Sequence, residues 1–219
     1  MEKLIVQPLN TQAYDLIKSK IFSGEIKPGT RLVDSQLAEE FGISRTPFRD
    51  ALRKLCEEGF VACEPGKKGY FVYQPSRKDI DDIFELRLIL DLAAADKLVH
   101  QILPGNTKAL ELLKNSYHTD QVDVSSFVKK DEDFHDTIIK LCDNQKMLEM
   151  YNSLRSQLRA FRSKTSQDET RRSKATNYHA KILEGLCDLD YEKACAAMKK
   201  HVELSREDAL KDYLADDVK

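Results

Sequence analysis

From residue 77 onward, apolar side chains recur every three or four positions, which is the spacing of one face of an α-helix. Pro104-Gly105, two polar stretches and short Asp- and Asn-containing turns interrupt this pattern. We therefore expect six helices in this part of the chain, at 77–101, 106–117, 125–142, 145–165, 169–187 and 190–215. Six helices with short connections predict an antiparallel bundle.

The first 75 residues follow a different pattern of shorter segments. Two short amphipathic helices are expected at 11–22 and 34–41, the second capped by Asp34 or Ser35. Gly42 supplies a sharp turn, a third helix runs to Leu55, and two strands follow at 60–63 and 69–73. Short helices joined through a glycine form a helix-turn-helix.

A domain boundary is expected at Gln74-Pro75-Ser76. Proline ends the last strand, and Ser76-x-x-Asp79 is a capping box that begins a new helix. The predicted fold is mostly α, with a winged helix-turn-helix domain at 1–75 and an antiparallel all-helical domain at 76–219.

The start of the third helix gathers polar side chains that suit nucleic acid. Ser44 can cap the helix, Arg45 and Thr46 lie in its first turn, and Arg49 follows one turn later. The opposite face is apolar and comprises Phe48, Ala51, Leu52 and Leu55. A helix N-terminus attracts phosphate and is the part of a recognition helix that meets base edges. The alternative is an ordinary amphipathic core helix with a polar cap.

The turn between the two expected strands is basic, because Pro65-Gly66 is followed by Lys67-Lys68. A hairpin with a basic tip beside a helix-turn-helix forms a wing that can enter the minor groove or rest on phosphates. The alternative is an ordinary hairpin with solvated lysines.

Composition restricts the function further. The 219 residues are 41% hydrophobic and 33% charged, with a formal net charge of −2, so the chain is no general polyanion binder. Any DNA contact must come from a local patch, which dimerisation would double. The five cysteines are scattered and form no CxxC pair, and the sequence shows neither a membrane-spanning run nor a signal peptide. These features predict a cytoplasmic protein that does not bind membranes.

About residues 10–75 resemble the GntR family of bacterial transcription regulators. The resemblance rests on three segments that follow one another in the family's order: GEIKPGTRL, LAEEFGISRTPFRDALRKLCEEGFV and PGKKGYFV. The resemblance implies that DNA is contacted by the recognition helix and wing tip, here Ser44, Arg45, Thr46, Arg49, Gly66 and Lys67. Ser35 and Gln36 stand where some relatives carry an arginine, which puts one family base contact in doubt.

Polar residues interrupt the apolar stripes of three helices in the second domain. Asp131 and His135 are four residues apart and share a helix face. His179 lies ten residues before Leu189 and His201 twelve after it, so on antiparallel helices their depths differ by only ~3 Å. One Asp and three His suit a divalent transition metal, Zn²⁺ or Ni²⁺, although a single buried His is more often a core residue.

This part of the chain is similar to the FCD-type effector domain of the FadR branch of the GntR family. Metal-carrying FCD domains show an Asp-x3-His pair and then one His on each of two later helices. Asp131, His135, His179 and His201 match that order.

Several arginines lie on the predicted helices of the same domain. Arg87 falls on an apolar stripe, where it can bind the carboxylate of an effector or pair internally with Asp91 one turn on. Arg159 or Arg162 can face a pocket, but together with Arg155 they are expected to form a solvated stripe. Asn144 is expected to cap the next helix.

Together these features predict a homodimeric DNA-binding regulator, because two half-sites match two-fold protein symmetry. We expect a repressor that binds a double-stranded operator and responds to a small organic acid near the metal, with activation as the alternative. A second possibility is that the metal ion itself is the signal. A metal-dependent enzyme is the third; no nucleophile motif, Gly-rich phosphate loop or paired catalytic carboxylate supports it, so we expect no enzyme.

Overall fold

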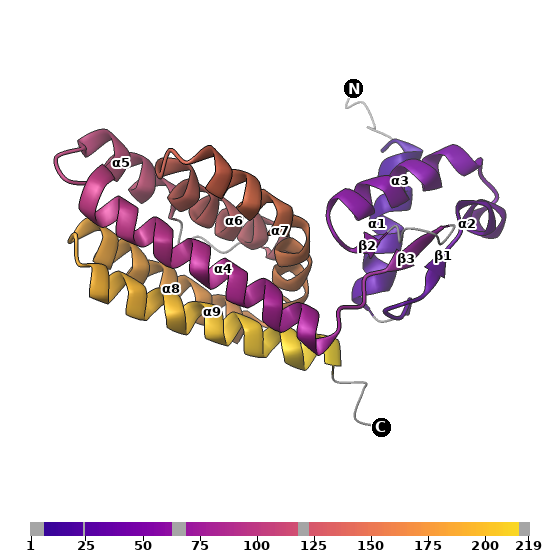
Figure 1. Cartoon of the computed structure of the whole chain (residues 1–219). Coiled ribbons are helices and arrows are strands. Elements are labelled where there is room, and N and C mark those ends of the chain that lie inside the picture. Colours follow the sequence, from indigo (N-terminus) through magenta and orange to yellow (C-terminus); the bar gives the residue numbers. More distant parts are fainter. Residues whose placement is uncertain (1–6, 24, 63–68, 118–122, 215–219) are drawn as a thin grey trace. The chain divides into compact units, whose positions relative to one another are not determined.

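The computed structural model describes residues 7–23, 25–62, 69–117 and 123–214. The chain divides into two compact units, Met1–Gln74 and Pro75–Lys219. The architecture is mostly helical, with one small sheet (Figure 1), as the hydrophobic pattern predicts.

The first unit contains helices α1 (Leu9–Phe22), α2 (Asp34–Phe41) and α3 (Arg45–Glu57). Its antiparallel sheet has the order β1-β3-β2, formed by β1 (Arg31–Leu32), β2 (Val61–Ala62) and β3 (Tyr70–Val72). The two-residue β1 was not expected, because it is too short to show an alternating pattern. It pairs Arg31 with Phe71 across the sheet.

Gly42 makes the turn of the helix-turn-helix. Its φ is 64°, in the left-handed region, and nothing lies within 4 Å of a Cβ built there, so backbone conformation alone favours glycine. The expected cap of α2 is wrong: its N-cap is Val33, and Asp34 lies in the first turn. Ser44 occupies the N-cap position of α3, but its side chain makes no capping hydrogen bond.

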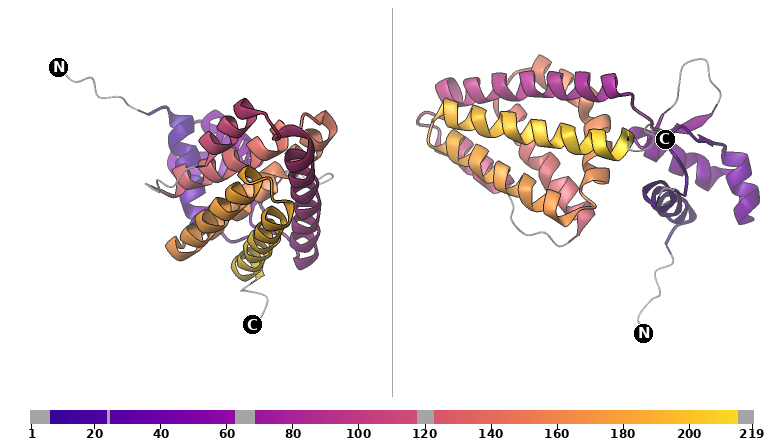
Figure 2. Two further views of the ribbon diagram at one scale, coloured as in Figure 1. Left: turned by 90° about the vertical axis from the view of Figure 1, so that its left-hand side faces the viewer. Right: turned by 90° about the horizontal axis from the view of Figure 1, so that it is seen from below.

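The second unit contains six α-helices among the described residues. They are α4 (Arg77–Lys97), α5 (Thr107–Ser116), α6 (Val124–Leu141), α7 (Gln145–Thr165), α8 (Glu169–Cys187) and α9 (Tyr191–Leu214). A π-helical segment, η1 (Leu98–Ile102), continues α4. α9 packs against both α4 and α8, and lies between them in Figure 2 (right).

Local sequence signals fix several of these helix ends. Ser76 and Asp79 form the predicted capping box at the start of α4. The Asn144 side chain accepts a hydrogen bond from the Met147 amide at 3.1 Å, so it caps α7 as expected. Gly185 lets α8 approach α9, because an added Cβ would lie 2.5 Å from the backbone nitrogen of Ala194.

Within the described part of the chain, no helix is both long and apolar enough to cross a bilayer.

Candidate metal centre and DNA-reading helix

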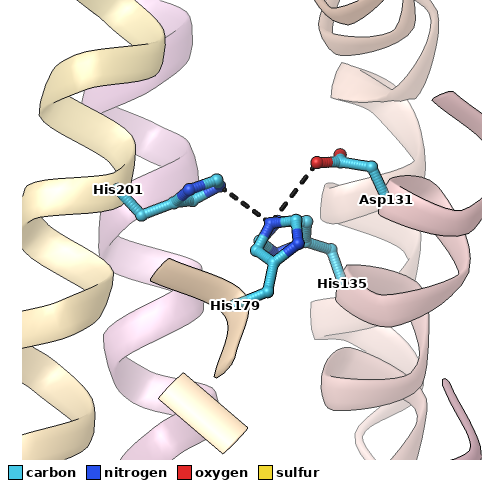
Figure 3. Close-up of side chains that lie close together, drawn as sticks. All are labelled: Asp131, His135, His179 and His201. Carbon is cyan, nitrogen blue, oxygen red and sulfur yellow. Dashed lines mark hydrogen bonds and ion pairs between the residues drawn. The ribbon is translucent and has the colours of Figure 1, made fainter. Parts of the chain in front are cut away.

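Four candidate metal ligands from three helices converge inside the bundle. Asp131 and His135 project from α6, His179 from α8 and His201 from α9 (Figure 3). One ligand atom from each lies within 4.8 Å of all the others, and all four residues are buried. The structure therefore brings together the four residues that helical spacing selected.

The distances between donor atoms are short. The Nε2 atom of His179 lies 3.2 Å from that of His135, 3.3 Å from that of His201, and 3.3 Å from Asp131 Oδ1. Three imidazole nitrogens and one carboxylate oxygen thus face one small volume, and this donor set fits Zn²⁺ or Ni²⁺.

Burial also keeps these imidazoles neutral. Desolvation lowers the pKa of His179 to about 4, although the Asp131 charge opposes the shift. Desolvation, followed by nearby positive charge, lowers the pKa of His135 and of His201 well below 6.5. At neutral pH each ring therefore offers a lone pair, which metal binding requires.

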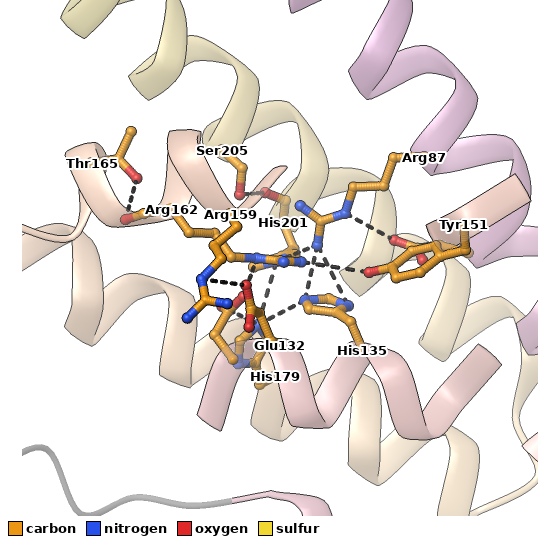
Figure 4. Close-up of polar contacts among 12 residues, drawn as sticks. Arg87, Glu132, His135, Tyr151, Arg159, Arg162, Thr165, His179, His201 and Ser205 are labelled. Carbon is orange, nitrogen blue, oxygen red and sulfur yellow. Dashed lines mark hydrogen bonds and ion pairs between the residues drawn. The ribbon is translucent and has the colours of Figure 1, made fainter. Parts of the chain in front are cut away.

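Arg87 reaches this cluster from α4. The residue is 1% exposed, and its Nη2 donates to His135 Nε2 at 2.9 Å and His201 Nε2 at 3.2 Å (Figure 4). Its Nε lies 3.3 Å from Asp91 Oδ2, so the internal ion pair with Asp91 is also present.

Arg162 reaches the cluster from α7. Its Nε forms a close ion pair with Asp131 Oδ2, and its Nη2 lies 3.5 Å from the Tyr151 hydroxyl. The expected solvated stripe is wrong for Arg162, whose side chain is only 10% exposed. Two neighbouring arginines are half-exposed and pair with buried acids of α6: Arg159 with Glu132 and Arg155 with Asp136.

Hydrogen bonding within the site is incomplete. In the described part of the chain, five buried side-chain atoms make no hydrogen bond, and all belong to this neighbourhood: Arg87 Nε, Asp91 Oδ1, Asp131 Oδ2, Glu132 Oε1 and Arg162 Nε. Four of them still lie in the ion pairs given above, and Asp91 Oδ1 is the one with neither kind of contact among the interactions described. A cavity of about 40 Å³ lies beside them, with Arg87, Asp131, Arg162 and His201 among its lining. Unsatisfied buried polar groups are costly, so this arrangement suits an additional polar ligand.

In the first unit, α3 has the two faces that the sequence predicts. Phe48, Ala51, Leu52 and Leu55 are buried. Ser44, Arg45, Thr46 and Arg49 are exposed, and Arg45 pairs with Asp34 at 3.1 Å. The two wing residues, Gly66 and Lys67, lie outside the described residues.

Comparison with known families explains this combination of units. Residues 9–72 match the gntR family of bacterial regulatory proteins, and residues 82–204, more than half of the chain, match the FCD domain. The chain belongs to the GntR family. It is a transcription regulator with an FCD-type C-terminal domain, and its homologues are regulators rather than enzymes.

Individual relatives agree with this assignment to the GntR family. The chain is 33% identical over 153 residues to the gluconate operon transcriptional repressor of Bacillus subtilis, which covers 68% of this chain and 61% of that protein. It is 24% identical over 199 residues to the transcriptional repressor RspR of Escherichia coli, covering 90% and 87% of the two chains.

Solved structures share the GntR fold. A GntR-type regulator from Rhodococcus sp. RHA1 superposes with a TM-score of 0.58 at 21% identity, over 93% of this chain and 98% of that one. McbR/YncC of E. coli gives a TM-score of 0.56 at 20% identity, over 95% and 100%. GntR regulators bind DNA, and FCD domains bind small effectors and metals.

Proposed function

We propose that this GntR regulator is a cytoplasmic, homodimeric repressor that leaves its operator when a small organic acid binds beside a divalent metal ion. The observation that carries the proposal is the buried cluster of Asp131, His135, His179 and His201 beside the buried Arg87 and the largely buried Arg162. A regulator needs a ligand site away from its DNA-reading helix, and this cluster provides donors for a metal and cations for an acid.

In this proposal Zn²⁺ or Ni²⁺ is held by the one carboxylate and the three imidazoles. When bound, the ion supplies positive charge and open coordination positions for an oxygen ligand. Arg87 stands next to this position and supplies planar N–H donors that match a carboxylate. The acid changes DNA affinity only if it binds one arrangement of the dimer better than the other.

The DNA-reading role falls to the exposed end of α3. Arg45, Thr46 and Arg49 are proposed to meet base edges, and Ser44 to contact phosphate. Gly66 and Lys67 are proposed to contact DNA from the wing. One bidentate arginine–guanine contact is worth ~1–3 kcal/mol of discrimination.

The operator role is tested by selecting binding sites from random DNA and measuring their affinity by gel shift. Arg45→Ala is expected to lose sequence preference while zinc content stays unchanged. Arg53→Ala is the matched control, because Arg53 is an exposed arginine two turns further along the same helix. Retained sequence preference in Arg45→Ala would contradict the assignment of α3.

The metal role is tested by elemental analysis after zinc loading. His179→Ala is expected to lower bound zinc, whereas His100→Ala, at an exposed histidine of η1 outside the cluster, is expected to bind as much as wild type. Equal zinc in both variants would count against the site.

The acid is tested by adding acetate, malonate or gluconate to the zinc-loaded protein–DNA complex. Gluconate is included because a relative is named for the gluconate operon. Release of DNA by an acid supports the proposal. If zinc alone changes DNA affinity and no acid adds to the effect, the ion itself is the signal. The full set of four buried ligands makes this the second candidate function.

A further inference from the structure

Two guanidinium groups contact three of the four candidate metal ligands. Arg87 Nη2 donates to the Nε2 atoms of His135 and His201, and Arg162 Nε pairs with Asp131 Oδ2. Of the four ligands, His179 alone has no guanidinium contact among the interactions described for these residues.

These contacts compete with a metal ion. An imidazole lone pair that accepts a hydrogen bond from Arg87 cannot at the same moment be donated to a metal. Arginine also stays charged at any ordinary pH, so neither guanidinium can leave by losing a proton. A divalent ion at this position therefore has to displace the Arg87 donor and share or replace the Arg162 contact.

Both side chains keep other partners when these contacts break. Arg87 retains Asp91 through its Nε, 3.3 Å away. Arg162 retains the Tyr151 hydroxyl at 3.5 Å. Each is thus held in place while N–H donors become available toward the same cavity, which both residues line together with Ser205.

Charge favours an anion in that cavity. Arg87, which is buried, and Arg162, whose side chain is 10% exposed, are balanced by the buried acids Asp91 and Asp131, and the three imidazoles are neutral. A divalent ion adds two positive charges to this balanced group. Buried charge is costly unless it is paired, so an anion gains affinity when the metal is present.

We propose that Arg87 and Arg162 couple the two ligands: they oppose metal binding when no anion is present and bind the anion when the metal has displaced them. Metal and anion then raise each other's affinity by the same factor, because coupling between binding sites is reciprocal. This inference rests on the proposed metal site and adds the residues that link it to the acid.

The test measures Zn²⁺ affinity by competition with a chromophoric chelator, with and without acetate or malonate, after correcting for zinc bound by the acids. Arg162→Met is expected to bind zinc at least about tenfold more tightly than wild type without anion, because a nearby positive charge is gone. Either acid is expected to tighten zinc binding by wild type about fivefold or more, and by a clearly smaller factor in that variant, which keeps only Arg87.

Arg155→Met is the matched control. Arg155 lies two turns earlier on α7 and pairs with Asp136 at 2.9 Å, and none of the interactions described for it reaches a ligand of the cluster. Its zinc affinity and its response to the acids are expected to match wild type. If Arg155→Met and Arg162→Met behave alike, the effect is general electrostatics and the proposal is wrong.

Arg87→Lys supplies a second variant if Arg162→Met does not fold. Lysine keeps a cation near Asp91 but loses the planar fork that reaches two imidazoles, so tighter zinc binding is expected. Weaker zinc binding by these variants would show that the arginines position ligands for the metal, and would overturn the inference. The same holds if neither acid tightens zinc binding by wild type. Failure of every protein to bind zinc would instead refute the metal site itself.

Discussion

Replacing Gly185 by alanine tests how closely α8 must approach α9. An added Cβ would lie 2.5 Å from the backbone nitrogen and 2.8 Å from the Cα atom of Ala194. Ordinary carbon contacts are ~3.5–4.0 Å, so the two helices must separate by roughly 1 Å.

Two effects oppose each other in this variant. Alanine gains ~0.5–1 kcal/mol over glycine in a helix interior. Overpacking costs typically ~1–3 kcal/mol, and the upper end applies because the atoms in the way belong to backbone and cannot rotate aside. We therefore expect a net loss of about 2 kcal/mol, which lowers the melting temperature by roughly 4–8 °C for a unit of this size.

The assay is thermal and urea unfolding of the chelator-treated protein, followed by circular dichroism. Ala196→Gly, at an exposed alanine of α9, is the control that measures helix propensity without a packing change. The separation should also weaken zinc binding, because the 3.3 Å approach of His179 and His201 joins the same two helices. A Gly185→Ala protein as stable as wild type, or more stable, would refute the argument from close packing.

Three further outcomes are expected. Ser76→Ala should lower the free energy of unfolding by about 1 kcal/mol in urea titrations, because it removes the hydroxyl that caps the Asp79 amide; no loss would mean that the box contributes nothing. The metal-free protein should lose stability as pH falls from about 6.5 toward 4, because the pKa of His179 is lowered to about 4 in the folded protein and the unfolded chain takes up the proton first. The free energy of unfolding, measured at about pH 7.5 and about pH 5, should differ less between the two pH values in His179→Gln than in wild type. Cys142 should resist iodoacetamide in the native protein and react after unfolding, because burial raises the pKa of its thiol to about 11; mass spectrometry of native samples that shows its modification would contradict this.

The sequence predicts most of the second unit because its helices carry long, regular apolar stripes and N-cap residues that can be recognised from sequence. The convergence of His179 and His201 also follows from sequence, since distance from a shared turn fixes depth on two antiparallel helices. Whether these residues bind metal remains a prediction.

Other features depend on tertiary contacts that no local pattern encodes. Arg162 looks solvated in a polar helix, and only the packing of α7 on α6 places it against Asp131. One signal was available for the neighbouring arginines: the four-residue spacing of Arg155 and Arg159 equals that of their partners Asp136 and Glu132 on the antiparallel helix α6. The strand β1 is two residues long, and its pairing with β3 is what defines it.

Because the two units are consecutive along the chain, the ribosome completes the first unit before the second. His201 follows Gln74, the last residue of the first unit, by 127 residues (201 − 74), and the ligand cluster is incomplete without it. Ribosomes add roughly 5–20 residues per second, and domains generally fold as units, the N-terminal one first. The helix-turn-helix therefore has roughly 6–25 s on the ribosome before the last ligand of the cluster is even polymerised. Each new molecule of this regulator therefore completes its helix-turn-helix unit before it can complete the cluster of Asp131, His135, His179 and His201.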